Sequence, residues 1–309
     1  MMSGVDILPV IENAAFMQEV HEAVRSFCKD VTEINFIEPS GDNVVVIANR
    51  QYVFRFPRDP NTARRLYYET ALLQKIGKQL PAVSVPEIVQ VHPQPFYMVA
   101  KYVEGDHLTD KEVQRLTIDE QVAIGQKIAA FSTQLNHAIS GLEVRRLRAE
   151  AKVDDLDEPW TPYFERLFVK DPLPNMKLRA IIDEHYQIWK DYTKQEQNTY
   201  AIHDDLHPRN LLFLGAQLVG IVDFGDANTG SIEEEFRWLY AMGDTVLRAA
   251  IEHYAQLTNV TVNYDHVREW AIMHELSTYT VRLARQDTES FPFKRAEEHL
   301  RTWLKDFPL

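Results

Sequence analysis

Two stretches of this sequence decide how it folds: His203-Asp-Asp-Leu-His-Pro-Arg-Asn210 and Asp223-Phe-Gly225. In the first, Asp205 stands two positions after the histidine and five positions before the asparagine. Apolar runs at 200–203 and 211–213 flank this polar loop, so we expect strands to hold it on rigid backbone. Together the two stretches fix about six residue types, a combination that rarely arises by chance.

The residue types at these positions suit phosphoryl transfer from a nucleoside triphosphate. That reaction needs a carboxylate to orient and deprotonate the attacking hydroxyl, and oxygen ligands for a Mg²⁺ ion that bridges the phosphates. We predict that Asp205 is the catalytic base and that His203 belongs to the catalytic pair. Asn210 and Asp223 are the expected metal ligands. The implied cofactors are Mg²⁺ and either ATP or GTP as phosphate donor.

Residues 203–212 and 219–227 resemble the aminoglycoside phosphotransferase and choline-kinase-like superfamily. The Val53-Phe-Arg-Phe-Pro57 segment places the resemblance nearest to the 2″-type aminoglycoside phosphotransferases. It implies an α+β, protein-kinase-like bilobal fold, with a small antiparallel-sheet N-lobe and a larger, mainly helical C-lobe. We expect a nucleotide-binding N-lobe over 1–103, a hinge near 98–103, and a catalytic and acceptor-binding C-lobe over 104–309.

The sequence departs from the family pattern at three places. Asp204 and Arg209 stand where the family often has glycine, which changes the expected shape of the loop. The aspartate of a downstream Gly-Asp-Pro-x-x-Asp pattern is missing, and Glu234 or Glu235 is expected to replace it.

Hydrophobic periodicity places the remaining elements of the two lobes. Apolar residues at 16, 20, 24 and 27 predict a helix, and the runs 34–37, 44–48 and 52–56 predict three strands. A helix over 62–78 and strands over 85–91 and 96–103 follow. Beyond 105 the pattern turns helical, beginning with a strong apolar stripe over 118–138.

The first lobe offers candidates for binding the nucleotide. A kinase-like site needs a cation on the third strand, paired with a helical glutamate. Arg55, which alternation places on the face opposite Phe54 and Phe56, and Glu69 fit these roles. The turn Ser40, Gly41, Asp42 and Asn43 could approach the phosphates with its backbone N–H groups. The backbone of Ala100 to Tyr102 is expected to bind the base.

Composition restricts the partners. The 33 Lys and Arg against 46 Asp and Glu give a net charge of −13, which argues against a nucleic-acid partner. Cys28 is the one cysteine, so a disulfide within the chain is impossible. Lacking an apolar run of about 18 residues and a signal-like start, the sequence predicts a cytoplasmic protein without a membrane partner. Arg145, Arg146 and Arg148 are expected to form a solvated helix face.

The acceptor is the least determined part of the prediction. Residues 109–309 carry −10 of the net charge, and they include acidic clusters at 154–158 and 233–235. Such a lobe would attract a cationic acceptor. We therefore expect an aminoglycoside, held by carboxylates of Asp226, Glu233, Glu234 and Glu235.

Three other interpretations stay open at this point. The same core could serve a metabolic kinase for choline, homoserine, a sugar or another natural product, since function resides in the site rather than the fold. A non-catalytic nucleotide-binding protein is disfavoured because Asp205, Asn210 and Asp223 are all present. A protein kinase is disfavoured because no Ala-Pro-Glu motif follows Gly225.

Overall fold

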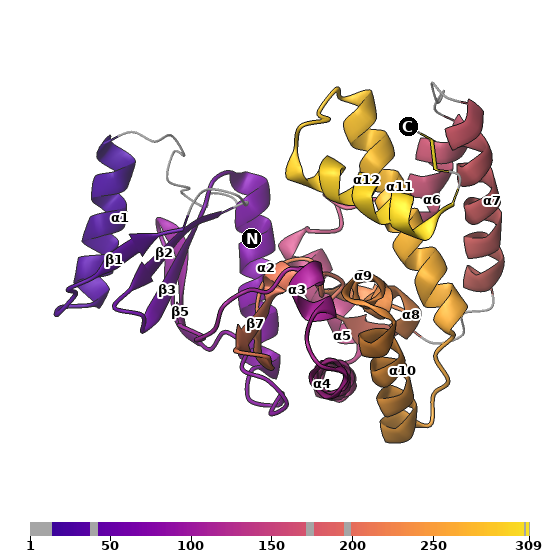
Figure 1. Cartoon of the computed structure of the whole chain (residues 1–309). Helices are drawn as coiled ribbons and strands as arrows, with labels where there is room; N and C mark the ends of the chain where they lie inside the picture. The colour runs from indigo at the N-terminus through magenta and orange to yellow at the C-terminus, as the bar shows by residue number, and fades with distance from the viewer. Residues whose placement is uncertain (1–13, 38–42, 171–175, 195–198, 306, 309) are drawn as a thin grey trace.

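The computed structural model describes residues 14–37, 43–170, 176–194, 199–305 and 307–308. It consists of two lobes that lie next to each other in Figure 1. The N-terminal lobe is built around an antiparallel sheet, and the larger C-terminal lobe is mainly helical. This confirms the α+β, bilobal organisation that the sequence predicts.

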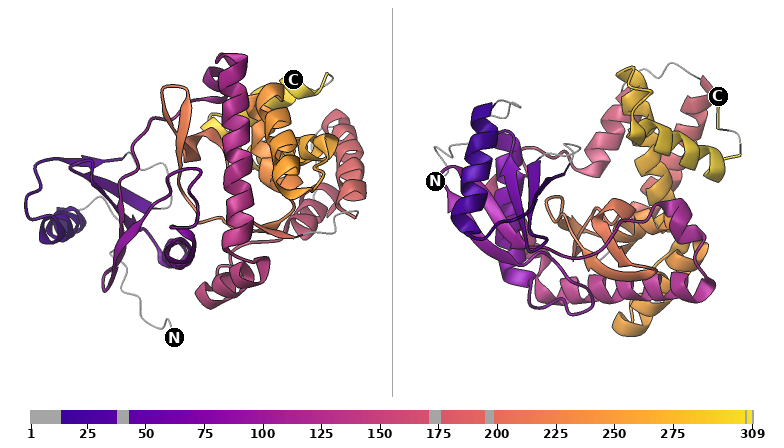
Figure 2. Two further views of the ribbon diagram at one scale, coloured as in Figure 1. Left: turned by 90° about the horizontal axis from the view of Figure 1, so that it is seen from below. Right: turned by 60° about the vertical axis from the view of Figure 1, so that its left-hand side comes forward.

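The N-lobe sheet contains five described strands in the order β1-β2-β3-β5-β4, each antiparallel to its neighbour. The strands are β1 (Ile34–Phe36), β2 (Asn43–Ala48), β3 (Tyr52–Pro57), β4 (Ile88–Pro93) and β5 (Phe96–Lys101). Helices α1 (Ala14–Phe27) and α2 (Pro60–Ile76) cover its two faces (Figure 2). These elements lie within a few residues of their predicted positions.

Alternation along β3 separates the two faces of the sheet. Phe54 and Phe56 pack under α1, together with Phe16, Val20 and Val24 of that helix. Arg55, between the two phenylalanines, lies on the side of α2. The period of two along a strand therefore determines which strand residue faces the cleft between the lobes.

Helix α2 belongs to the cores of both lobes. Asp59 caps its start by accepting hydrogen bonds from the N–H groups of Asn61 (2.8 Å) and Thr62 (2.9 Å). Ala63 and Leu66 pack on the sheet residues Phe96, Met98 and Ala100. Further along the helix, its buried residues join the C-lobe core instead: Tyr68, Leu72, Leu73 and Ile76.

The connection between the lobes follows the end of β5, and the predicted hinge at 98–103 overlaps the last residues of this strand. Strand β5 continues to Lys101, and Met98 and Ala100 within it pair with both β3 and β4. The connecting segment then runs close to the C-lobe hairpin, where Asp106 forms a β-bridge with Phe213. Gly105 adopts φ +147°, and a Cβ there would lie 2.9 Å from the Leu212 Cβ, so this approach requires glycine.

The C-lobe contains the rest of the chain. Its first half holds α3 (Asp110–Gln114), α4 (Ile118–Ala138), α5 (Gly141–Ala151), α6 (Trp160–Phe164), the π-helical η1 (Glu165–Lys170) and α7 (Met176–Thr193). The motif region holds β6 (Tyr200–Ile202), the 3₁₀ turn η2 (Pro208–Asn210), β7 (Leu211–Leu214), β8 (Gln217–Ile221) and β9 (Asn228–Gly230). The last part holds α8 (Ile232–Glu235), η3 (Phe236–Trp238), α9 (Leu239–Met242), α10 (Asp244–Thr258), α11 (Tyr264–Ala284) and α12 (Phe291–Trp303).

Two hydrophobic clusters organise this lobe. The larger contains residues of α2, α4, α10 and the motif strands. The smaller joins α6, α7, α11 and α12, the group at the upper right of Figure 1. Among the helices of the described ranges, none combines the length and apolar character needed to cross a membrane.

The contact between α4 and α10 depends on Gly125. A Cβ at this position would lie 2.3 Å from the Val246 carbonyl oxygen and 3.0 Å from the Ala249 Cβ. The two helices therefore approach each other more closely than any larger residue would allow.

We predict that Gly125→Ala destabilises the protein, although alanine is the better helix former. The clash with a backbone oxygen should lower the free energy of unfolding by about 1–3 kcal/mol, as overpacking does. The measurement is denaturant unfolding of the purified variant. Ala123→Ser on the exposed side of α4 is the control and should change stability little. Unchanged stability of Gly125→Ala would contradict this account of the helix contact.

Candidate active site

The polar loop between β6 and β7 presents Asp205 on a fixed backbone. The Asn210 side-chain amide donates to both the carbonyl oxygen and the Oδ2 of Asp205, each at 2.9 Å. The Asn210 N–H donates to the His207 carbonyl oxygen at 2.9 Å, which closes the turn η2. Asp205 and Asn210 therefore lie together, and Asn210 sets the orientation of the Asp205 carboxylate.

His203 is fully buried, and its place in the catalytic pair stays a prediction. Its ring packs edge-on against Phe131 and Phe224. Nδ1 accepts from the Asp205 N–H (3.3 Å), and Nε2 lies 3.1 Å from the Val222 carbonyl oxygen, so Nε2 carries the proton. Burial lowers the pKa of His203 to about 4. A neutral, doubly hydrogen-bonded imidazole at this position helps to fix the backbone of Asp205.

Glu235 holds the backbone of the loop between β6 and β7 by hydrogen bonds. Its carboxylate accepts from the N–H groups of His203 (3.1 Å) and Asp204 (2.9 Å), and from the Ser132 hydroxyl (3.3 Å). Burial raises its pKa to about 7, against the two backbone hydrogen bonds that favour the charge. Of the two glutamates considered as replacements for the family aspartate, Glu235 therefore occupies the loop-supporting position.

Arg237 and Asp204 form a buried ion pair that the sequence analysis missed. Asp204 takes the left-handed conformation (φ +67°) where the family often has glycine. The Arg237 guanidinium donates to the Asp204 carboxylate at 2.6 Å, to the Asp204 carbonyl oxygen, and to the Glu234 carbonyl oxygen at 2.8 Å. The aspartate in a glycine position was the one signal in the sequence that pointed to such a partner.

The predicted pair of Arg55 and Glu69 is present and extends to Asp223. The Arg55 guanidinium contacts both Glu69 carboxylate oxygens, at 2.6 and 2.7 Å, and the Asp223 Oδ1 at 3.1 Å. The Phe224 N–H also donates to Glu69, at 3.3 Å. Burial opposes the charge of Arg55, but Glu69 and Asp223 outweigh it and raise its pKa. One network thus joins β3, α2 and the Asp-Phe-Gly segment across the cleft.

The pKa of the Asp205 carboxyl group lies near neutral pH. Burial raises the pKa of Asp205 to about 7, with help from the charges of Asp223 and Asp204 and against Arg237 and the Asn210 amide. Asp223 behaves differently: burial works against its charge, but Arg55 lowers its pKa. Carboxylates of this kind, one easily protonated and one firmly ionised, suit a proton acceptor and a metal ligand respectively.

The predicted metal ligands, Asn210 and Asp223, suit a magnesium ion by their donor atoms. The Asn210 amide nitrogen is used by Asp205, which leaves Oδ1 for a ligand. Asp223 adopts φ +66°, and its side chain is half exposed. Within the described ranges no cluster of three or more His, Cys, Asp or Glu side chains is arranged around a metal. Two oxygen ligands with the rest supplied by phosphates and water are typical of Mg²⁺ sites.

The other predicted nucleotide contacts are only partly described. Ser40, Gly41 and Asp42 lie outside the described residues, and Asn43 is the first residue of β2. Ala100 lies inside the sheet ladder. The Tyr102 N–H donates to the Gln51 carbonyl oxygen at 2.8 Å and is not available to a base, contrary to expectation.

Among the acidic residues expected to bind or attract a cation, Asp226 is paired with an arginine, and so are Asp154 and Asp157 of the 154–158 cluster. Arg65 contacts Asp226 at 2.8 Å and also Asp157. Burial and the charge of Asp205 raise the pKa of Asp226 to about 7. Arg148, predicted to be solvated, is 2% exposed and contacts Asp154 and Asp157.

The three glutamates at 233–235 are also engaged within the protein instead of forming an open acidic surface. Glu233 accepts from the Asn263 N–H at 3.0 Å, and Glu234 and Glu235 are buried. The sequence could not separate an acidic surface from carboxylates that neutralise the protein's own arginines.

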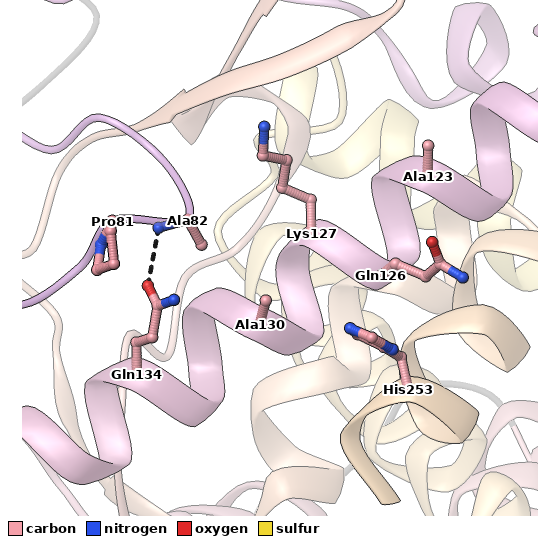
Figure 3. Close-up of a pocket in the computed structure, with 8 residues that line it drawn as sticks. All are labelled: Pro81, Ala82, Ala123, Gln126, Lys127, Ala130, Gln134 and His253. Atoms are coloured by element: carbon pink, nitrogen blue, oxygen red, sulfur yellow. Dashed lines mark hydrogen bonds between the residues drawn. The ribbon is translucent and has the colours of Figure 1, made fainter. Parts of the chain in front are cut away.

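A separate groove lies between the 81–82 segment, α4 and α10 (Figure 3). Its volume is about 400 Å³, and Lys127, Gln134 and His253 are among its lining residues. Gln134 accepts from the Ala82 N–H at 2.9 Å, the dashed line in Figure 3. None of its lining residues belongs to the motif region.

Comparison with known proteins agrees with this geometry. The model of the phosphotransferase enzyme family matches residues 38–276. The GDP complex of an F108L mutant of aminoglycoside 2′-phosphotransferase-IIIa is 19% identical, with a TM-score of 0.74 over 94% of this chain and 97% of that one. No curated protein matches the sequence.

Two further solved structures share the fold. The streptomycin–ATP–APH(2″)-IIa ternary complex is 17% identical, with a TM-score of 0.67 over 95% of this chain and 97% of that one. The macrolide 2′-phosphotransferase MphH from Brachybacterium faecium is 16% identical, with a TM-score of 0.66 over 94% and 99%. The family model covers well over half of the sequence and includes both motif stretches, so this chain belongs to the phosphotransferase enzyme family.

Proposed function

We propose that this phosphotransferase moves the γ-phosphate of ATP or GTP to a hydroxyl group of a small molecule. The observation that carries the proposal is the pairing of Asp205 with Asn210 in the C-lobe, together with the contacts of Arg55 with Glu69 and Asp223, which join the two lobes. Phosphoryl transfer relies on positioning and electrostatic stabilisation, which such an arrangement supplies.

In the proposed reaction, Asp205 is the proton acceptor. The acceptor oxygen bonds to the γ-phosphorus, the bond from that phosphorus to the bridging oxygen breaks, and the nucleoside diphosphate leaves. The hydroxyl proton passes to the Asp205 carboxylate, whose Oδ2 is already held by Asn210. A base with a pKa near the working pH is the most effective proton acceptor.

The remaining residues bind and orient the donor. Arg55 binds the phosphates and is oriented by Glu69. Asn210 and Asp223 hold Mg²⁺, which neutralises phosphate charge when bound. Ser40, Gly41, Asp42 and Asn43 are proposed to close over the phosphates, and the end of β5 near Ala100 to receive the base. His203, Glu235 and the Asp204–Arg237 pair keep the loop in place.

The solved relatives suggest an aminoglycoside as acceptor, since one was captured with kanamycin and another with gentamicin. A metabolic alcohol is the alternative. The pairing of Asp226, Asp157 and Asp154 with arginines removes much of the support for a polycationic acceptor. The choice is tested by coupled release of ADP or GDP over aminoglycosides, macrolides and metabolic alcohols.

Asp205→Asn should lower kcat by about 10²-fold or more, because the amide keeps the shape but cannot accept a proton. In the unaltered enzyme, kcat/KM should fall as the pH drops through about 7, since protonated Asp205 is no longer a base. Steady-state kinetics from pH 5.5 to 9 measures both. Asp155→Asn, at an exposed position, is the control. A near-normal kcat in Asp205→Asn would exclude this residue as the base.

Arg55→Ala should raise the nucleotide KM by about tenfold or more with less change in the acceptor KM, because charge-assisted hydrogen bonds to phosphate are lost. Arg55→Lys should give a nucleotide KM between those of the unaltered enzyme and Arg55→Ala, since lysine keeps the charge without the planar fork. Arg25→Ala, at an exposed position of α1, is the control. A larger rise in the acceptor KM than in the nucleotide KM would place Arg55 elsewhere.

Arg237→Met should destabilise the protein by about 3–5 kcal/mol, because it leaves the buried Asp204 carboxylate unpaired. The double variant Asp204→Gly/Arg237→Met should regain much of that loss and of kcat, since glycine suits φ +67°. Denaturant midpoints and kcat are compared, with Arg248→Met in the exposed pair with Asp244 as the control. Strictly additive effects would show that the two residues act independently.

A further inference from the structure

Beyond the proton acceptor, the cleft wall formed by η2, η3 and α12 gathers positive charge and aromatic rings. The His207 Nε2 lies 3.4 Å from the Asp205 Oδ2, and its ring meets Trp238 edge-on at 5.3 Å. The Arg295 guanidinium lies 4.9 Å from the centre of the same Trp238 ring. This wall is continuous with the catalytic loop and lies on its C-lobe side.

The positive charge of Arg295 is balanced by the carboxylate of Glu275. It contacts both carboxylate oxygens of Glu275, at 3.1 and 3.3 Å. Glu275 also contacts His299 at 2.8 Å. Arg237 is likewise committed to Asp204. Each of these two arginines therefore has its positive charge balanced by a carboxylate of the protein itself.

Arg209 differs from both. It is exposed and lies one position before Asn210 in η2, and within the described part of the chain no carboxylate pairs with it. Its guanidinium stacks 3.9 Å above the ring of Phe291, the first residue of α12, which is 53% exposed. Stacking holds the flat face of a guanidinium and leaves its N–H edge free for a planar anion.

Arg209 lies close in the chain to the reacting region. It follows His207 by two positions and directly precedes Asn210, whose N–H donates to the His207 carbonyl oxygen at 2.9 Å. His207 is itself in contact with Asp205. Since Arg295 and Arg237 are paired with carboxylates, Arg209 is the arginine of this wall that is left to bind a ligand.

We propose that the acceptor carries a carboxylate or phosphate group, and that Arg209 binds this anion so that the hydroxyl lies at Asp205. The inference rests on the proposed phosphotransferase activity and names the acceptor class for it. Arg209 would then determine specificity without taking part in the proton transfer. The stack on Phe291 holds Arg209 against the first turn of α12.

The first experiment works without an identified acceptor. A small-molecule extract is separated by anion exchange into a retained, anionic fraction and a flow-through of neutral and cationic molecules. Each fraction is incubated with the enzyme, Mg²⁺ and γ-labelled ATP or GTP. Labelled product from the anionic fraction supports the inference. Product from the flow-through alone overturns it while the phosphotransferase proposal stands, and product from neither fraction contradicts both.

The second experiment compares matched acceptors and variants. We expect gluconate to be preferred over glucose, or fructose 6-phosphate over fructose, which separates the carboxylate from the phosphate source. Arg209→Gly, the residue the family often has, should lower kcat/KM for the preferred anion by about 10- to 100-fold. The nucleotide KM should stay unchanged. Arg209→Lys should recover part of the loss, which a merely structural defect would not show.

Arg146→Gln is the matched control, because this exposed arginine of α5 pairs with Glu143 and Glu150. It should leave kcat/KM unchanged. An equal loss for charged and neutral acceptors in Arg209→Gly, or a raised nucleotide KM, would overturn the assignment. Transfer to kanamycin or gentamicin that is insensitive to Arg209 would overturn it as well.

Discussion

The ion pair between Arg55 and Glu69 is the contact on which the geometry of the cleft depends. Glu69 is almost completely buried, and removing its partner would leave a charge without solvent. Burial of such a pair costs solvation, which only good geometry and further hydrogen bonds recover. Here the further contacts are the Asp223 carboxylate and the Phe224 N–H, both from the other lobe. The pair therefore fixes a strand, a helix and a loop in one arrangement.

Much of this site follows from the sequence because it depends on local spacing. The alternation along β3 places Arg55 opposite its flanking phenylalanines, and the loop spacing brings Asn210 onto Asp205. Residues whose partners are far away in the chain could not be assigned in this way. Arg148 reads as part of a charged helix face, yet it is buried and donates to the carbonyl oxygen of Ala227, 79 residues further along the chain.

Arg237 and Glu235 illustrate the same limit on the other side of the loop. Both lie about thirty residues beyond the backbone groups that they bind, on short helical segments with little periodicity. The net charge of the chain likewise does not show which individual carboxylates and arginines are paired. A chain with a net charge of −13 can pair its carboxylates with its own arginines and still leave an exposed arginine, Arg209, next to the predicted metal ligand Asn210.

The shared helix α2 has a consequence for how nucleotides enter and leave. Its first turns pack on the sheet, whereas Tyr68, Leu72, Leu73 and Ile76 are part of the C-lobe core. Rotating the N-lobe as one body would pull these side chains out of that core. The same helix is also bound to the sheet, through Glu69 and Arg55 and through the packing of Ala63 and Leu66. A relative movement of the two lobes therefore has to disturb one of these two sets of contacts, and α2 couples nucleotide entry to the packing of the C-lobe core.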